Sequence, residues 1–180
     1  MGTLDRADQG LVELDGVNLD TLSGAALSTF RNQKIGFVFQ FHYLLPEFTV
    51  LENVMLPLRL QPDFHFKQSE QKALAWLERV GLSRQAQQTP KVLSGGEQQR
   101  VAIARALIAE PKIIFADEPT GNLDGQTAEE IEQLLFDLNR ELSTTLVLVT
   151  HDQNLAALCQ RHVKLVDGQI QEIVKAEERI

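Results

Sequence analysis

Three short apolar runs constrain the fold of this 180-residue chain more than any other feature of its sequence. Each run is apolar on both faces, as a strand buried within a sheet would be, and each is followed by polar residues; the runs are Ile35–Phe39, Ile113–Ala116 and Leu146–Val149. Helical patterns separate them, and alternation of strands and helices favours a largely parallel sheet covered by helices. The sequence therefore predicts an α/β fold.

Turn signals indicate a further short strand near the start of the chain and a pair of strands near its end. A strand over 11–14 ends at Asp15-Gly16, and Asp167-Gly168 lies between two apolar-rich segments at 162–166 and 169–174. An Asp-Gly pair between such segments is a strong hairpin signal, because both residues tolerate the positive φ that a tight turn requires. We expect a hairpin at the carboxyl end of the chain.

The stretch between the first apolar run and position 94 has a helical character. Thr49 and Glu52 form a predicted capping box, and the short helix that follows should be interrupted by Pro57 and Pro62. Positions 69–80 have the spacing of an amphipathic helix that ends at Gly81. A later helix from Thr127 carries a similar apolar stripe, and ordinary core packing is the favoured interpretation of both stripes.

Composition excludes several classes of protein. The chain is 43% hydrophobic and 23% charged, which is typical of a globular domain and not of a disordered one. The net charge of −8 argues against a protein that mainly binds nucleic acid. The single cysteine, Cys159, cannot form an internal disulfide and indicates a reducing compartment. No apolar run approaches the roughly 20 residues of a spanning helix, and the first residues lack a signal-peptide pattern.

The segment Leu93-Ser94-Gly95-Gly96-Glu97 precedes a helical pattern that continues to about position 108. Ser94 and Glu97 have the spacing of a capping box, and the two glycines would let a ligand approach the free N–H groups of the helix N-terminus. Such an end is an anion site. A well-capped helix with no ligand explains the same residues, and the segment alone leaves the two interpretations open.

Asp117 and Glu118 directly follow the apolar run at 113–116. The carboxyl ends of parallel strands are where α/β sheets bind ligands, so Asp117 is a candidate ligand of Mg²⁺ and Glu118 a candidate general base. The alternative is a pair of solvated acids at a strand end.

Gln40 and His151 follow the other two apolar runs, and a parallel sheet would bring them to the same edge as the two acids. A glutamine there can contact a metal-bound water or a phosphate, whereas a single histidine is more often structural. The segment Gly121-Asn122-Leu123-Asp124 has the composition of a turn.

Taken together and in this order, these motifs resemble those of an ABC-type nucleotide-binding domain. Gln40, Ser94-Gly95-Gly96, Asp117-Glu118, Asp124 and His151 correspond to its Q-loop, signature, Walker B, D-loop and H-loop. The runs at 100–107 and 116–124 make the resemblance highly specific, and it extends over nearly the whole chain. Residues 39–49 and Glu97 are similar to the lipoprotein-releasing ATPases of the LolD group, whose wider relatives include the MacB-type exporters.

The resemblance implies a fold, cofactors and roles for these residues. The fold would be a partial P-loop NTPase (RecA-like) ABC domain with an inserted helical lobe, and the cofactors would be ATP and Mg²⁺. In such proteins two ATP molecules lie between two subunits, and the signature of one subunit, here Ser94, Gly95, Gly96 and Glu97, faces ATP held by the other. Asp117 and Gln40 would contact the metal, Glu118 would be the base, His151 and Gln40 would complete the catalytic set, and Asp124 would act across the dimer.

The resemblance also implies a division of the chain and its partners. Residues 1–40 would be the remnant of an N-terminal β-lobe with a core strand, 41–92 a helical lobe that docks on a membrane permease, and 93–180 the core with the remaining motifs and the hairpin. The partners would be permease subunits and a second nucleotide-binding subunit, with no nucleic acid. The protein would lie on the cytoplasmic face of the inner membrane, held there through the permease.

One motif of the class is absent from these 180 residues. Phosphate binding requires Gly-x-x-x-x-Gly-Lys-Ser/Thr, and none of the lysines follows a glycine: Lys34, Lys67, Lys72, Lys91, Lys112, Lys164 and Lys175. We therefore expect a chain that corresponds to the family without its N-terminal segment and its Walker A loop. We also expect it to hydrolyse ATP negligibly alone and to expose apolar strand edges that reduce its stability.

Three other functions are open on this sequence. One is a non-catalytic subunit that contributes only its signature face to an intact partner, and another is the ATPase of a MacB-type exporter. The third is an ABC-type ATPase of DNA maintenance, which ranks last because that class has long coiled-coil arms where this chain has a short helical stretch, and because the net charge is unfavourable.

Overall fold

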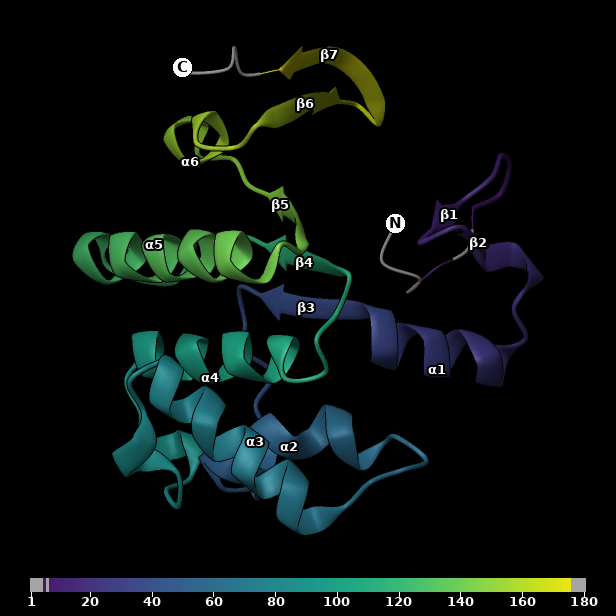
Figure 1. Cartoon of the computed structure of the whole chain (residues 1–180). Helices are drawn as coiled ribbons and strands as arrows, with labels where there is room; N and C mark the ends of the chain where they lie inside the picture. Colours follow the sequence, from purple (N-terminus) through teal and green to yellow (C-terminus); the bar gives the residue numbers. More distant parts are fainter. Residues whose placement is uncertain (1–4, 6, 176–180) are drawn as a thin grey trace.

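A computed structural model describes residue 5 and residues 7–175 of the chain, and it confirms an α/β architecture (Figure 1). Short 3₁₀ turns occur at Leu19–Thr21, Ser83–Gln85 and Pro90–Val92. The helices and strands are β1 (Glu13–Leu14), β2 (Val17–Asn18), α1 (Gly24–Lys34), β3 (Ile35–Phe39), α2 (Val50–Arg59), α3 (Phe66–Arg79), α4 (Gly95–Leu107), β4 (Ile113–Asp117), α5 (Gly125–Leu142), β5 (Thr145–Val149), α6 (Gln153–Ala157), β6 (Arg161–Val166) and β7 (Gln169–Lys175).

The three predicted apolar strands form one parallel sheet in the order β3-β4-β5. Their register places Phe39 opposite Asp117, and Asp117 opposite Val149. The carboxyl ends of the three strands are therefore level with one another. This alignment brings the polar residues that follow each strand to one edge of the sheet.

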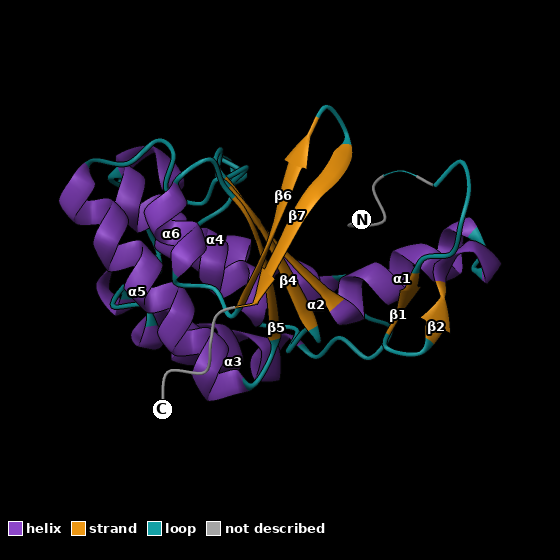
Figure 2. Ribbon diagram, turned by 90° about the horizontal axis from the view of Figure 1, so that it is seen from above, coloured by secondary structure: helices purple, strands orange, loops and turns teal. Residues whose placement is uncertain are grey.

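One face of this sheet is packed against helices. Val38, Ile114 and Ala116 are each 1% exposed on that face, and Figure 2 shows α4, α5 and α6 together on one side of the strands. The approach of α4 is close: a Cβ at Gly36 would lie 2.6 Å from the carbonyl oxygen of Ala106. Glycine at this position lets the helix backbone contact the strand directly.

The opposite face of the sheet carries aromatic side chains. Phe37 stacks on Phe39 and on Phe115, with ring centroids 5.6 and 5.9 Å apart. These rings are only partly buried. In Figures 1 and 2 the helix α1 and the strands β1 and β2 lie away from α5, on the other side of the sheet.

The helices α2 and α3 pack beneath α4 and share its core (Figure 1). The predicted capping box of Thr49 and Glu52 is present at the start of α2. The predicted interruption at Pro57 is wrong, because α2 continues to Arg59. Pro57 lies in the last turn, where the missing N–H removes a single intrahelical hydrogen bond. The boundaries proposed for a separate helical lobe remain a prediction.

The helix α3 agrees closely with the amphipathic pattern predicted over 69–80. It begins at Phe66, three residues before the predicted start, and ends as expected before Gly81, which has φ +76°. The predicted core stripes of α3 and α5 are buried or packed against the core: Ala73, Trp76, Leu77 and Val80 in and after α3, and Ile131, Leu134, Leu135 and Leu138 in α5.

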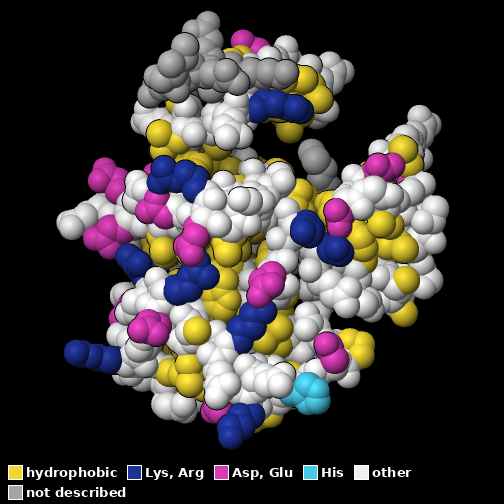
Figure 3. Space-filling model, in the orientation of Figure 1, with side chains coloured by type: hydrophobic (Ala, Val, Ile, Leu, Met, Phe, Trp, Pro, Cys, Tyr) yellow, Lys and Arg dark blue, Asp and Glu magenta, His cyan; other side chains and the backbone are white. Residues whose placement is uncertain are grey.

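Both predicted turns join antiparallel strands. Asp15 and Gly16 connect β1 and β2, and Asp167 and Gly168 connect β6 and β7, with positive φ at all four residues. The second hairpin exposes hydrophobic side chains (Figure 3), among them Val163, Leu165, Ile170 and Ile173, which are 40–61% exposed. Cys159, which precedes this hairpin, is only partly buried and is therefore not a core residue.

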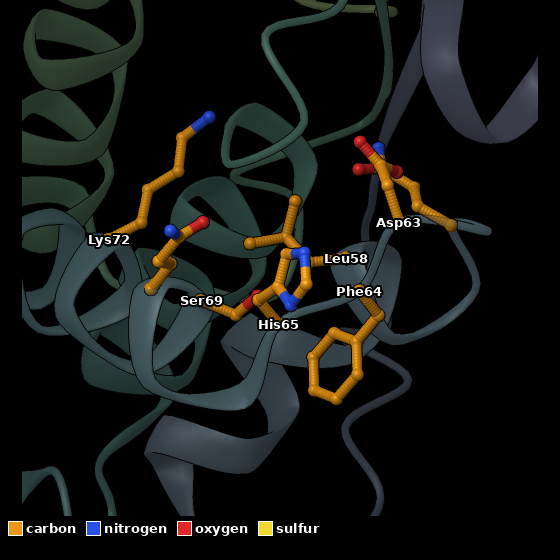
Figure 4. Close-up of a pocket in the computed structure, with 8 residues that line it drawn as sticks. Leu58, Asp63, Phe64, His65, Ser69 and Lys72 are labelled. Atoms are coloured by element: carbon orange, nitrogen blue, oxygen red, sulfur yellow. The ribbon is translucent and has the colours of Figure 1, made fainter.

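A small cavity of about 160 Å³ lies between the end of α2 and the start of α3 (Figure 4). It is lined by Leu58, Phe64, His65 and Ser69, with Lys72 at its margin. Among the described residues, no helix is long and apolar enough to span a bilayer.

Candidate functional site

Glu118 is the centre of a hydrogen-bonded cluster at the carboxyl ends of β4 and β5. Its carboxylate accepts hydrogen bonds from the Oγ1 of Thr150 at 3.2 Å and from the backbone N–H of His151 at 2.8 Å. The ring Nδ1 of His151 lies 2.7 Å from the same carboxylate. Glu118 adopts a left-handed φ of +43°, which is a costly conformation for a residue with a Cβ. The turn that begins at Glu118 therefore directs its side chain to the end of the neighbouring strand.

The cluster changes the acid–base properties of both partners. Partial burial taken alone raises the pKa of Glu118, but the hydrogen bonds from His151 and Thr150 together outweigh it, so the net pKa lies below the usual value. The hydrogen bond to Glu118 and the charge of that carboxylate raise the pKa of His151. Glu118 is thus held as an anion, while the His151 side chain remains 86% exposed.

Asp117 lies at the same edge of the sheet but in a different environment. Its side chain is exposed, and it has no hydrogen-bond or ion-pair partner among the described residues. In the same part of the chain, no group of three or more His, Cys, Asp or Glu side chains is arranged to hold a metal ion. Asp117 is therefore a free carboxylate beside the Glu118–His151 pair.

Gln40 reaches from the end of β3 to the turn after β4. Its Nε2 donates to the Oδ1 of Asn122 at 2.9 Å, and the Nδ2 of Asn122 donates back to the carbonyl of Gln40 at 3.2 Å. Gly121 allows this contact, because a Cβ there would lie 2.9 Å from the Gln40 amide. The sequence predicted the shared sheet edge, and the turn at 121–124, but not Asn122 as the partner of Gln40.

The N-terminus of α4 carries the predicted capping box. The backbone N–H of Ser94 donates to the Oε2 of Glu97 at 2.8 Å, and the N–H of Glu97 donates to the Oγ of Ser94 at 3.3 Å. Ser94 and Gly95 are exposed, whereas Gly96 is buried against α5. A Cβ at Gly96 would lie 2.4 Å from the Cγ2 of Thr127, so close helix packing explains this glycine without a ligand. The anion-binding interpretation stays a prediction.

The side chain of Gln99 connects α4 with the end of β3 and with the turn after β4. The buried side-chain amide of Gln99 donates to the carbonyl of Pro119 at 2.5 Å and to that of Phe39 at 3.4 Å.

Asp124, in the predicted turn, caps α5 by accepting a hydrogen bond from the backbone N–H of Thr127 at 3.2 Å. Sequence reasoning missed Gln99 and Thr150. Thr150 was detectable as the neighbour of His151, whereas Gln99 has no pattern that distinguishes it from a surface glutamine.

Comparison with known proteins gives a consistent result. A model of the ABC transporter family matches residues 1–121. The chain is 50% identical over 170 residues to the lipoprotein-releasing system ATP-binding protein LolD of Bacteroides fragilis, a match that covers 94% of this chain and 78% of the relative. It is 52% identical to the LolD of Geobacter metallireducens, over 94% of this chain and 75% of that relative.

Solved structures agree with the sequence comparison. The chain superposes with a TM-score of 0.86 on the ATP-binding cassette MJ0796 in a dimeric post-hydrolysis state bound to ADP and Pi, at 44% identity, over 98% of this chain and 77% of that one. These matches confirm the predicted resemblance to LolD-type proteins and the predicted fold class, an ABC nucleotide-binding domain of the P-loop NTPase type. The chain therefore belongs to the ABC transporter family, within its ATP-binding proteins.

Proposed function

We propose that the chain is the ATP-binding and ATP-hydrolysing subunit of an ABC transporter that releases lipoproteins from the inner membrane. The observation that carries this proposal is the meeting of Gln40, Asp117, Glu118 and His151 at one edge of the parallel sheet. The LolD relatives, which are 50% and 52% identical to this chain, support lipoproteins as the cargo. The subunit would lie on the cytoplasmic face of the membrane.

Glu118 would act as the general base. Its carboxylate is ionised, and it is already oriented by Thr150 and His151, so it can accept a proton from an attacking water without reorganising. His151 would hold the reacting phosphate and water through its exposed ring. Gln40, fixed by Asn122, would orient the water shell of the metal.

Bound MgATP would supply the phosphoanhydride bond and the metal charge that stabilises its cleavage. The residues at the strand ends fit the metal ion of that group. Mg²⁺ in ATPase sites takes one or two protein ligands, with phosphates and water as the rest, and the free carboxylate of Asp117 together with Gln40 is such a donor set.

The signature residues Ser94, Gly95, Gly96 and Glu97 would contact ATP held by a second subunit. The exposed N-terminus of a 13-residue helix is suited to an anion, because its first N–H groups lack intrahelical acceptors. Asp124 would act across the same dimer. Permease subunits would dock on residues 41–92. We propose no nucleic-acid partner, because the net charge is −8.

These 180 residues contain no Gly-Lys-Ser or Gly-Lys-Thr loop. Catalysis of phosphoryl transfer is almost entirely positioning and charge stabilisation, and that loop supplies much of both. We expect the chain alone to show negligible Mg-ATPase activity. ATP turnover by the unmodified chain that disappears in the Glu118→Gln variant would contradict this expectation.

A mixed assay tests the signature role directly. A full-length LolD relative whose own signature serine is changed to arginine should regain ATPase activity when this chain is added, because the chain would present Ser94 and Gly95 to the relative's nucleotide. The matched control is this chain with Ser94→Arg, which should not restore activity. No restoration by the unmodified chain, despite complex formation in the presence of ATP, would refute the proposed site.

The exposed, capped N-terminus of α4 also fits a second candidate, a non-catalytic subunit that contributes only its signature face. A second mixture distinguishes the two. Here the relative keeps its signature serine, and its own general base is changed to glutamine, so that activity must come from the site of this chain. Activity that this chain restores and that Glu118→Gln removes assigns a catalytic role to Glu118, whereas no restoration favours the signature-only role.

A further inference from the structure

The segment that follows Gln40 is attached to the signature helix by one side chain. Arg105, near the end of α4, donates from Nη2 to the carbonyl of His42 at 2.6 Å and from Nη1 to the carbonyl of Tyr43 at 2.7 Å. Two adjacent peptide groups are thus held by a single planar guanidinium. A bidentate contact of this kind fixes direction as well as distance.

Arg105 is a partly buried charge held by hydrogen bonds to backbone carbonyls. Among the described residues no carboxylate forms an ion pair with it, and burial lowers its pKa to about 10. Desolvating a charge is unfavourable unless hydrogen bonds compensate for it. Here the compensation comes from the two backbone carbonyls, so the position of residues 42 and 43 and the burial of Arg105 depend on each other.

The backbone that Arg105 holds is in an unfavourable conformation. Tyr43 has φ +47°, and conformations of this kind persist in non-glycine residues only where surrounding contacts impose them. Phe41 and Tyr43 are 62% and 65% exposed. The Tyr43 ring contacts Phe39 edge-on at a centroid distance of 5.4 Å. Phe39, directly before Gln40, and Tyr43, three positions after it, are therefore in contact.

Gln40 is bracketed by two contacts from the same helix. Gln99 binds the carbonyl of Phe39, directly before Gln40, and Arg105 binds the carbonyls of His42 and Tyr43, two and three positions after it. The backbones of β3 and α4 are also in contact at Gly36. Farther along, Asn53 accepts from the Leu45 N–H at 2.8 Å and so holds residue 45 on α2 instead. The anchoring of the chain changes from α4 to α2 between positions 43 and 45.

We propose that Arg105 is a positioning residue that ties the backbone after Gln40 to the signature helix, so that Gln40 and that helix move as one body. Its importance for hydrolysis rests on the proposed function. A shift of Ser94 at the start of α4 would then be transmitted to Gln40 and to the exposed rings of Phe41 and Tyr43.

The chain offers a specific probe of this contact, because Tyr43 is its only tyrosine and Trp76 its only tryptophan. Labelling with 3-fluorotyrosine gives a single ¹⁹F resonance that reports the Tyr43 ring, and Trp76 fluorescence reports the fold independently. The variants are Arg105→Met, whose side chain has a similar length and no charge, and Arg105→Lys, whose side chain keeps the charge but lacks the planar guanidinium. The control is Arg100→Met, also on α4, which removes the 3.0 Å ion pair between Arg100 and Glu130 of α5. No nucleotide is present, so failure here is separate from failure of the proposed function.

In Arg105→Met we expect the ¹⁹F resonance to shift towards the position of free fluorotyrosine, while Trp76 emission and the slow exchange of the Leu45 amide stay as in the unmodified chain. Arg105→Lys should give an intermediate shift, and Arg100→Met none. An unchanged resonance in folded Arg105→Met, or an equal shift in Arg100→Met, overturns the proposal. If Arg105→Met does not fold, Arg105→Lys decides: a folded Arg105→Lys with the unmodified resonance also overturns it.

Discussion

At the scale of single residues, the strand-end site depends on one backbone conformation. The left-handed φ of Glu118 directs its side chain to Thr150 and His151 instead of into solvent beside Asp117. Two adjacent acids thereby acquire different environments: Glu118 is held as an anion by hydrogen bonds, while the side chain of Asp117 has no partner within residue 5 and residues 7–175. Different environments are what allow neighbouring carboxylates to take different roles.

Replacing Glu118 by glutamine should lower the pKa of His151 towards its usual value. Glu118 raises that pKa through a hydrogen bond and its charge, and the amide supplies neither in the same way. A group whose pKa is raised in the folded state stabilises the fold below its unfolded pKa, and the contribution is lost as pH rises through the folded pKa. A ¹H NMR titration of His151 Cε1–H measures this shift.

His42 is an internal control in the same titration. Burial, followed by the charge of Arg105, lowers its pKa, and no contact joins it to Glu118. Its titration should be the same in Glu118→Gln as in the unmodified chain. A His151 pKa that does not change in the variant would show that the contact does not form in solution.

At the scale of elements, the start of α4 combines a cap with close packing. The side chains of Ser94 and Glu97 each accept a hydrogen bond from the backbone N–H of the other residue, and Gly96 lets the helix approach Thr127 of α5. Both features were partly visible in the sequence. The capping box was predicted from spacing alone, whereas the reason for Gly96 required the position of α5.

Ser94→Ala should lower the free energy of unfolding by about 1 kcal/mol, the usual effect of losing a hydroxyl cap. Thr49→Ala at the capping box of α2 should have a similar effect, because the geometry is the same. Urea denaturation of the two variants, followed by Trp76 fluorescence, measures both. A much smaller loss for Ser94→Ala alone would mean that the Ser94 hydroxyl does not cap α4 in solution.

Gly96→Ala should also destabilise the chain. Overpacking costs about 1–3 kcal/mol, and helix propensity returns roughly 1 kcal/mol, so we expect a net loss of about 1 kcal/mol. The double variant Gly96→Ala/Thr127→Ser should recover most of that loss, since serine lacks the clashing Cγ2. Gly95→Ala is the control, with its Cβ 3.3 Å from the mobile end of Leu123. Equal losses in the presence and absence of Thr127→Ser would contradict this packing explanation.

At the scale of the whole molecule, the sheet is asymmetric. In the part of the chain that the structure describes, β5 pairs with β4 alone, and Val149 on it is 55% exposed. Parallel sheets are normally covered on both faces, and here the aromatic face of Phe37, Phe39 and Phe115 lies opposite the helical layer. A partly exposed apolar face next to a free edge favours self-association.

Val149→Lys should therefore reduce self-association of the purified chain, because a charge on an edge strand opposes pairing with another copy. Multi-angle light scattering over a concentration series measures the change. Leu60→Lys is the matched control: Leu60 is 76% exposed, but it follows α2 and is not in a strand. Equal effects of the two substitutions would show that hydrophobicity in general, and not the β5 edge, drives association.

Residue types at fixed spacing were enough to predict the three parallel strands, the turns, both capping boxes and the family; the patterns are apolar runs, Asp-Gly pairs, Ser/Thr-x-x-Glu and the motifs from Gln40 to His151. The tertiary structure alone decided the partners: Asn122 for Gln40, Thr150 for Glu118, and Arg105 for the carbonyls of His42 and Tyr43. It also decided that α2 continues through Pro57. Local patterns record periodicity and backbone preference over a few residues. Contacts between side chains and carbonyls some 30 to 80 positions apart depend on how the packed elements orient each residue, and no local pattern contains that orientation.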